Sequence, residues 1–266
     1  MLINVGLGLI VGVILALTGA GGGVLAVPLL VFGIGLRVAE AGPISLLAVG
    51  MAAALGAVLG LKAGTLRYKA ALLMAGTGML LSPFGIWLGN RVDNRGLSIL
   101  FGIVLLLIAY RTFRQAHDQP VRDKQPGERT PPCIRDSDSG RFIWTARCAG
   151  VLVLSGSVTG LLSGLLGVGG GFVLVPALQR YTNLAMQSIV ATSLAVIALV
   201  SVTGVVSSAV AGNLNWMIAV PFCAGALAGM MGGRLISSRL AGPQLQYGFA
   251  AVSALVAVGM IGKSIL

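Results

Sequence analysis

Two glycine-rich stretches decide the fold of this chain. The first reads GAGGGVLAVP from Gly19 to Pro28, and the second reads GVGGGFVLVP from Gly167 to Pro176. Each interrupts an apolar run of about 30 residues, which as one helix would reach about 45 Å, beyond a hydrocarbon core of about 30 Å. Glycine and proline most disfavour a continuous helix. We therefore predict that each run is a helix, a break and a second helix, with Pro28 and Pro176 as part of the breaks.

The composition predicts that the bilayer is the main solvent of the chain. Hydrophobic residues make up 56% of it and charged residues only 9%, more apolar surface than a soluble domain can bury. No charged side chain occurs in residues 1–36, 148–179 or 181–233, and each run exceeds the roughly 20 residues that span a membrane. The 40 glycines are typical of membrane helices in close contact. The expected fold is an all-α polytopic membrane protein.

The two glycine stretches belong to a longer internal repeat with an offset of 148 residues. We expect two homologous repeats of four segments each, with about eight transmembrane helices in total, each repeat opening with a glycine-broken segment. The expected domains are a first repeat in residues 1–113, a charged linker in 114–147 and a second repeat in 148–266. The pairs that match at this offset include Pro28 with Pro176, Ser45 with Ser193, Gly64 with Gly212, Arg91 with Arg239 and Phe101 with Phe249.

Charge favours a membrane topology over a nucleic-acid partner. The 18 basic residues are scattered between apolar runs and form no single basic face. Lysine and arginine concentrate in cytoplasmic loops, so the cluster of Lys62, Arg67 and Lys69 and the linker are expected inside. Eight full crossings would make the repeats parallel. If each leading segment instead folds back at its glycines, each half has five passes and the halves are inverted.

The residue pattern gives little support to metal, cofactor or catalytic chemistry. Cys133, Cys148 and Cys223 form no CxxC pair, so we expect isolated thiols rather than a disulfide framework or a zinc site. A serine hydrolase at Ser163 would need a nearby base, and the single histidine, His117, lies in the linker. No GxxxxGK[ST] phosphate loop occurs. We expect no cofactor, no metal and no enzymatic activity.

The breaks are the expected binding site. Interrupted segments at matching positions of a duplicated transporter present half-helix N-termini, whose free N–H groups and positive dipole ends attract anions. Hydroxyl groups near the start of the following segment add donors, although glycines and hydroxyls in membrane helices also serve packing. The expected substrate-binding residues are Gly21, Gly22, Gly23, Ser45, Gly169, Gly170, Gly171, Thr192 and Ser193.

The same stretches resemble the paired GxGGGxxxxP motifs of the TauE/SafE family, the sulfite exporter and sulfonate-uptake permeases. Thr192-Ser193-Leu194 is similar to the TSL motif of that family, whereas the first half keeps Ser45 but has Ile44 in place of the threonine. The likeness covers nearly the whole chain apart from the linker. It implies a secondary carrier for a small anion in the inner membrane of a bacterial cell, with a sulfur-containing cargo such as sulfite or a sulfonate.

The alternative is an ion-coupled cation carrier or channel. Such proteins usually bury carboxylates on the ion path. The seven acids are Glu40, Asp93 and five residues of the linker, which leaves the interior of every predicted segment without one. This distribution favours the anion carrier.

Overall fold

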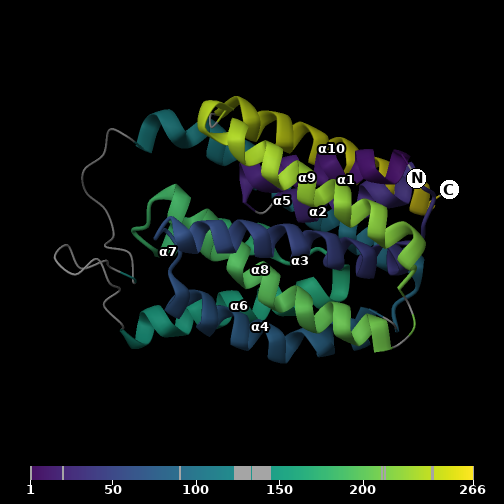
Figure 1. Cartoon of the computed structure of the whole chain (residues 1–266), viewed down its shortest axis with the longest axis horizontal. Helices are drawn as coiled ribbons and strands as arrows, with labels where there is room; N and C mark the ends of the chain where they lie inside the picture. The colour runs from purple at the N-terminus through teal and green to yellow at the C-terminus, as the bar shows by residue number, and fades with distance from the viewer. Residues whose placement is uncertain are drawn as a thin grey trace.

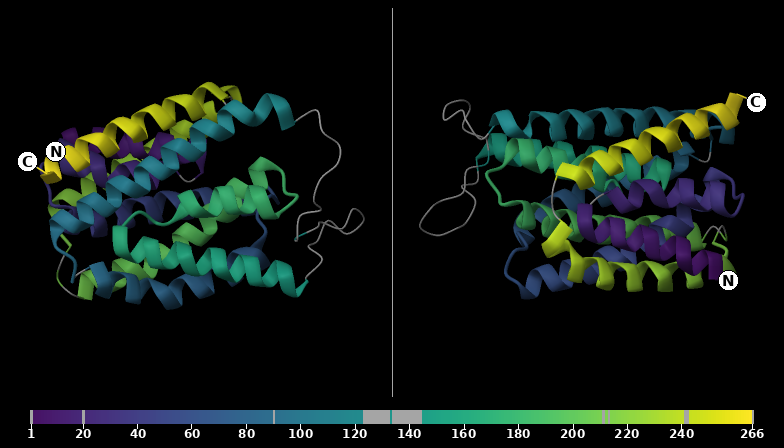
Figure 2. Two further views of the ribbon diagram at one scale, coloured as in Figure 1. Left: turned by 180° about the vertical axis from the view of Figure 1, so that it is seen from behind. Right: turned by 90° about the horizontal axis from the view of Figure 1, so that it is seen from above.

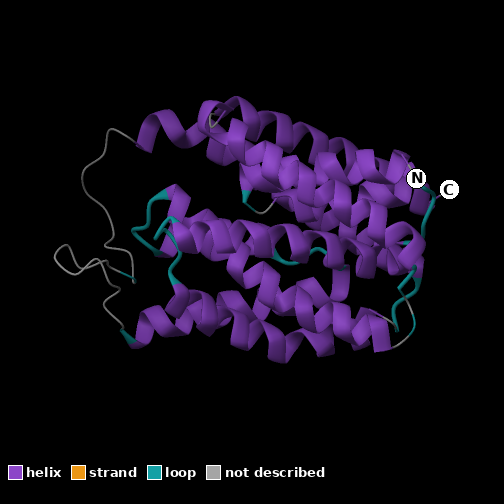
Figure 3. Cartoon of the chain, viewed as in Figure 1, coloured by secondary structure: helices purple, strands orange, loops and turns teal. Residues whose placement is uncertain are grey.

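A computed structural model gives the architecture, and it describes residues 2–19, 21–89, 91–122, 133, 145–210, 212, 214–240 and 243–265. Within these residues every regular element is a helix, as Figures 1 and 3 show. The all-helical prediction is confirmed. The helices are α1 (Leu2–Thr18), α2 (Gly21–Gly33), α3 (Val38–Lys62), α4 (Tyr68–Gly89), α5 (Asn94–Arg122), α6 (Ala146–Leu166), α7 (Gly171–Tyr181), α8 (Met186–Val210), α9 (Trp216–Leu240) and α10 (Pro243–Ile265).

Length and composition mark the chain as a multi-pass membrane protein. Among the described residues, six helices are long and apolar enough to cross a bilayer, and three shorter apolar helices accompany them. Large apolar side chains such as Leu80, Leu154 and Leu235 point out of the bundle, which is the arrangement that lipid favours. The six long spans are Val38–Lys62, Tyr68–Gly89, Arg95–Arg114, Ala146–Leu166, Met186–Val210 and Trp216–Leu235.

The first glycine break turns the chain back on itself. A side chain at Gly22 would lie 2.5 Å from the Cβ atom of Leu15 and from the carbonyl oxygen of Val11, while Gly33 lies against Leu7. Residues later in α2 therefore pack on residues earlier in α1. The two helices form an antiparallel hairpin.

The second break makes the same turn. The Cys133 N–H donates to the carbonyl oxygen of Tyr181 at 3.2 Å, and Cys133 is bonded to Cys148 near the start of α6, so α7 ends beside the beginning of α6. Both chain termini lie at one end of the bundle and α6 begins at the other (Figure 1). Among the described residues there are thus ten helices, five before the linker and five after it, and each leading segment folds back at its glycines as in the hairpin alternative.

Helices from the two halves pack on one another in crossed pairs. The most extensive contacts join α1 with α9, α4 with α6, α3 with α8 and α5 with α10, and the three views of Figures 1 and 2 show the halves interleaved. Glycines allow the backbones to touch: a Cβ atom on Gly12 would overlap Ala226, one on Gly229 would overlap Leu9, and one on Gly160 would overlap Gly78. The prediction of close helix packing is confirmed.

Pro28 and Pro176 do not end a helix, contrary to the expectation. They lie inside α2 and α7, and the interruptions lie at the glycines before them. A proline removes one helical N–H donor and clashes with the carbonyl four residues before it, but membrane helices tolerate this where neighbouring helices and local adjustments satisfy the freed backbone groups. The prolines therefore follow the breaks.

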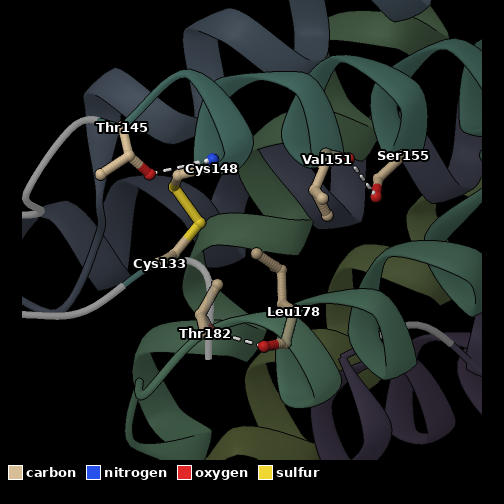
Figure 4. Close-up of a disulfide and its surroundings, with 7 residues drawn as sticks. All are labelled: Cys133, Thr145, Cys148, Val151, Ser155, Leu178 and Thr182. Atoms are coloured by element: carbon tan, nitrogen blue, oxygen red, sulfur yellow. Dashed lines mark hydrogen bonds between the residues drawn. A yellow bond between two sulfur atoms is a disulfide. The ribbon is translucent and has the colours of Figure 1, made fainter. Parts of the chain in front are cut away.

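The linker departs from the prediction at two points. First, α5 continues to Arg122, because arginine and glutamine are good helix formers even where a segment is too polar to be buried. Second, the expectation of isolated thiols at Cys133 and Cys148 is wrong, since the two form a disulfide with Cα atoms 5.0 Å apart (Figure 4). Sequence motifs such as CxxC do not reveal this pair, because the two cysteines meet only in the folded chain, where Cys133 lies between the end of α7 and the beginning of α6. Residues 123–132 and 134–144 of the linker lie outside the described residues.

Candidate functional site

Left-handed glycines build both breaks. Gly19 has φ 71° and follows the end of α1, whereas Gly167, Gly169 and Gly170 have φ between 66° and 76°. This region is sterically costly for a residue with a Cβ atom. Gly21 then begins α2 and Gly171 begins α7. The sequence therefore requires glycine in these loops for backbone geometry alone.

The two breaks lie against each other. A Cβ atom on Gly23, in the first turn of α2, would overlap the carbonyl oxygen of Val168 in the second break. Gly167 makes a similarly close approach to the backbone of Gly42 on α3. The N-terminal turn of α2 thus packs on the loop that leads into α7, and α2 and α7 are in contact.

Ser45 and Ser193 connect the halves in a crossed pattern. The Ser45 hydroxyl donates to the carbonyl oxygens of Gly42 and Gly167. Ser193 donates to Val190 at 2.9 Å and more weakly to Gly19 at 3.4 Å. Each buried serine thus bonds the glycine that ends the first helix of the other half. Their hydroxyl protons are engaged by the protein itself, so in this conformation the two serines fasten the breaks.

Thr192 faces another part of the molecule. Its hydroxyl donates to the Ser188 carbonyl oxygen at 2.6 Å and accepts the Arg67 backbone N–H at 3.2 Å. These contacts join α8 to the loop between α3 and α4, away from the breaks. Of the predicted hydroxyl groups, the structure therefore brings Ser45 and Ser193 to the breaks and leaves Thr192 outside them.

Three further hydroxyl groups lie near the second break, of which the sequence singles out only Ser163, and that as a candidate nucleophile. Thr159 and Ser163 on α6 and Ser201 on α8 are 0–1% exposed, and their hydroxyl oxygens have no hydrogen-bond partner. The available signal was a difference between the halves, since the residues 148 positions earlier are the apolar Val11, Leu15 and Ala53. Buried polar groups are normally paired. Among the described residues, the Ser253 hydroxyl on α10 and the Arg67 Nε atom also lack a partner, but Thr159, Ser163 and Ser201 are the ones on the helices that flank the second break.

A cavity leads toward the second break from the end of the bundle that holds the termini. It holds about 60 Å³, enough for a few water molecules. It lies between α3, α4, α6 and α8, and its lining includes Gly42, Leu46, Gly164, Gly167, Ser207 and Ser208. Gly167 thus belongs both to the break and to the cavity wall.

Charged side chains stand apart from the breaks in the described part of the chain. Glu40 pairs with Arg37 at the surface and Asp93 is exposed. Arg234 on α9 donates to the carbonyl oxygen of Gly56 on α3 at 3.1 Å. No group of three or more histidine, cysteine or acidic residues able to hold a metal occurs among the described residues. The polar groups that border the breaks are neutral hydroxyl and peptide groups.

Comparison with known proteins places this architecture in a family. A model described as sulfite exporter TauE/SafE matches residues 4–260. The probable membrane transporter protein YunE of Bacillus subtilis is 30% identical over 248 residues, which cover 88% of this chain and 87% of YunE. No solved structure matches the chain significantly.

Two further relatives carry similar names. A probable membrane transporter protein of Xylella fastidiosa (strain Temecula1) is 27% identical over 99% of this chain and 96% of its own length. One from Methanocaldococcus jannaschii is 31% identical over 75% of this chain and 69% of its own. With the family match across nearly the whole sequence, these relatives show that the chain belongs to the TauE/SafE family of membrane transporters.

Proposed function

We propose that this protein is a secondary carrier for a small anion, with a sulfur-containing oxyanion such as sulfite or a sulfonate as its cargo. The contact between Gly23 and Val168 carries the proposal, because it sets the N-terminal turn of α2 against the loop that opens α7. Helix N-termini present unpaired N–H groups and a positive dipole end to anions. Membership of the sulfite exporter family supports the same class of cargo.

In this proposal Gly21, Gly22, Gly23, Gly169, Gly170 and Gly171 form the anion path, and Ser45 and Ser193 hold the two breaks together. Neutral donors suit a carrier because binding must be weak enough for release. A buried arginine would hold an anion more tightly and is costly to insert into a membrane. Transport of this kind involves no covalent step, in agreement with a non-enzymatic role.

The proposed architecture is a pair of inverted repeats, residues 1–113 and 148–266, joined by the linker. The offset of 148 residues relates Ser45 to Ser193 and Gly19 to Gly167, and the crossed hydrogen bonds of the serines follow the same relation. Inverted repeats with interrupted helices at the interface are a recurring design of secondary transporters.

Sulfite transport by the purified protein in liposomes tests the proposal. We expect uptake of radiolabelled sulfite above that of protein-free liposomes, with competition by other sulfur oxyanions and sulfonates and weaker competition by acetate. The panel of anions is sulfite, other sulfur oxyanions, sulfonates and acetate. The cation carrier would instead be established if the protein took up no sulfite but carried sodium, potassium or protons at a rate that none of these anions changes.

The topology follows from the charges at the two ends of the bundle. The end that holds the linker has Lys62, Arg67 and Lys69 in addition to the basic residues of the linker itself, whereas the opposite end has Arg37, Arg91, Arg95 and Lys263. Because lysine and arginine mark the cytoplasmic side, we place the protein in a bacterial inner membrane with the linker on the cytoplasmic side and both termini on the opposite, periplasmic side.

Cysteine labelling checks this orientation. In a variant without native cysteines, a membrane-impermeant thiol reagent should label Asn215→Cys on intact spheroplasts and label Ala63→Cys only after permeabilisation. The opposite pattern would place the linker outside. A linker on the cytoplasmic side would put Cys133 and Cys148 in a compartment that keeps thiols reduced, so a Cys133–Cys148 disulfide that persists in acid-quenched wild-type cells would count against this orientation.

A further inference from the structure

The buried hydroxyl groups of α6 and α8 fall into two sets. One set bonds a backbone carbonyl of its own helix, as serine and threonine commonly do in membrane helices. Ser155 donates to Val151 at 2.7 Å (Figure 4), and Ser208 donates to Gly204 at 2.8 Å. The second set is Thr159, Ser163 and Ser201, whose hydroxyl oxygens have no hydrogen-bond partner.

The three unpartnered hydroxyl residues surround the second break. Thr159 and Ser163 are one turn apart on α6. A Cβ atom on Gly170 would lie 2.6 Å from the carbonyl oxygen of Thr159, and the Gly167 N–H donates to the carbonyl oxygen of Ser163 at 2.9 Å. From α8, the Ser201 hydroxyl oxygen lies 3.7 Å from the position of a Cβ atom on Gly169. All three residues therefore border the segment that leads into the N-terminus of α7.

Packing does not explain these hydroxyl groups. At the corresponding places of the first half, Val11, Leu15 and Ala53 are fully buried, which shows that apolar side chains fill equivalent positions. Burying a hydroxyl group without a hydrogen-bond partner in such surroundings lowers the stability of the folded protein. Three of them at one break indicate a ligand that supplies their hydrogen-bond acceptors.

We propose that Thr159, Ser163 and Ser201 donate hydrogen bonds to the transported oxyanion beside the N-terminus of α7. The hydroxyl groups make the site asymmetric: those of the second half recognise the anion, and the N-terminal turn of α2 lies against the same loop through Gly23. An oxyanion with several oxygen atoms accepts from several hydroxyl groups at once. The inference rests on the proposed anion transport and adds the residues that recognise the cargo.

The test uses Thr159→Val, Ser163→Ala and Ser201→Ala, singly and together, in the full chain. Sodium sulfite is titrated against the thermal unfolding of purified protein in detergent, and the apparent Kd is read from the stabilisation. We expect each substitution to raise the Kd about tenfold and the triple variant to lose the response. Without sulfite, the variants should unfold at the wild-type temperature or above, since each removes an unpaired polar group.

Ser155→Ala and Thr203→Val are the matched controls. They remove hydroxyl groups from the same two helices, but these groups already bond a backbone carbonyl and do not line the cavity, so the Kd for sulfite should stay at the wild-type value. A triple variant that binds sulfite like the wild type overturns the inference while leaving anion transport intact. If the wild type itself binds neither sulfite nor any other anion of the panel, the proposed function fails and this inference fails with it.

Discussion

Replacing Gly160 by leucine is expected to abolish the folded protein. Gly160 lies where α6 crosses α4, and a Cβ atom there would overlap the backbone of Gly78. Backbone atoms cannot rotate away as a side chain can, so the two helices must separate along one of the most extensive contacts of the bundle. Overpacking in a dense interior costs about 1–3 kcal/mol or more, and this site belongs at the upper end. Gel filtration of detergent-extracted protein should show aggregates in place of a single peak.

Gly150→Leu is the control for this substitution. Gly150 lies on the same helix and is exposed, and a Cβ atom there would meet nothing within 4 Å. The variant should elute and unfold like the wild type, or slightly better, because leucine favours a helix over glycine by up to about 1 kcal/mol. Equal stability of Gly160→Leu and Gly150→Leu would contradict the packing that the structure shows between α4 and α6.

The second large effect is expected at Gly169, where alanine should lower the transport rate of the protein that still folds. Gly169 has φ 76°, and alanine in this conformation costs about 1–2 kcal/mol. Its methyl group would press on the side chain of Ile197, at 3.0 Å, which must shift slightly, and would touch Val49 at 3.5 Å. It would also stand beside the hydroxyl of Ser201, in the space assigned to the anion. We expect the initial rate of sulfite uptake to fall about tenfold or more, a change of at least about 1.4 kcal/mol.

Gly35→Ala separates strain from obstruction. Gly35 has φ 77° in the loop between α2 and α3, and a side chain there meets nothing within 4 Å. Its backbone penalty should therefore match that of Gly169→Ala, while sulfite uptake per folded molecule stays at the wild-type rate. If the two variants lose transport equally, the anion does not pass Gly169 and the effect is strain alone.

The sequence was sufficient to locate the breaks but not the direction of the chain after them. The triglycines and the length of the leading segments predict an interruption, because both follow from local backbone preferences. Whether α2 continues across the membrane or returns depends on the contact of Gly22 with Val11 and Leu15. That contact is a tertiary one, and glycine at position 22 is compatible with either outcome.

The site residues were predictable to a similar degree. Ser45 and Ser193 were found because they match across the repeat, and both reach the breaks. A search for matching residues does not find groups that only one half possesses, such as Thr159 and Ser201, whose counterparts are Val11 and Ala53. Burial without a partner is visible only in three dimensions. The disulfide was missed for the same reason, since fifteen residues separate its cysteines along the chain.

The crossed pairing of helices has a consequence for how the protein is made. α1 ends at Thr18, but α9, on which it packs most extensively, begins at Trp216. At synthesis rates of about 5–20 residues per second, the ribosome needs roughly 10–40 s to reach that partner. During this interval Gly8 and Gly12 have no α9 backbone to contact, and the newly inserted α1 must wait in lipid or beside the insertion machinery. The first half therefore completes its packing only when the second half arrives, and a chain that terminates early in the linker leaves α1 without its partner.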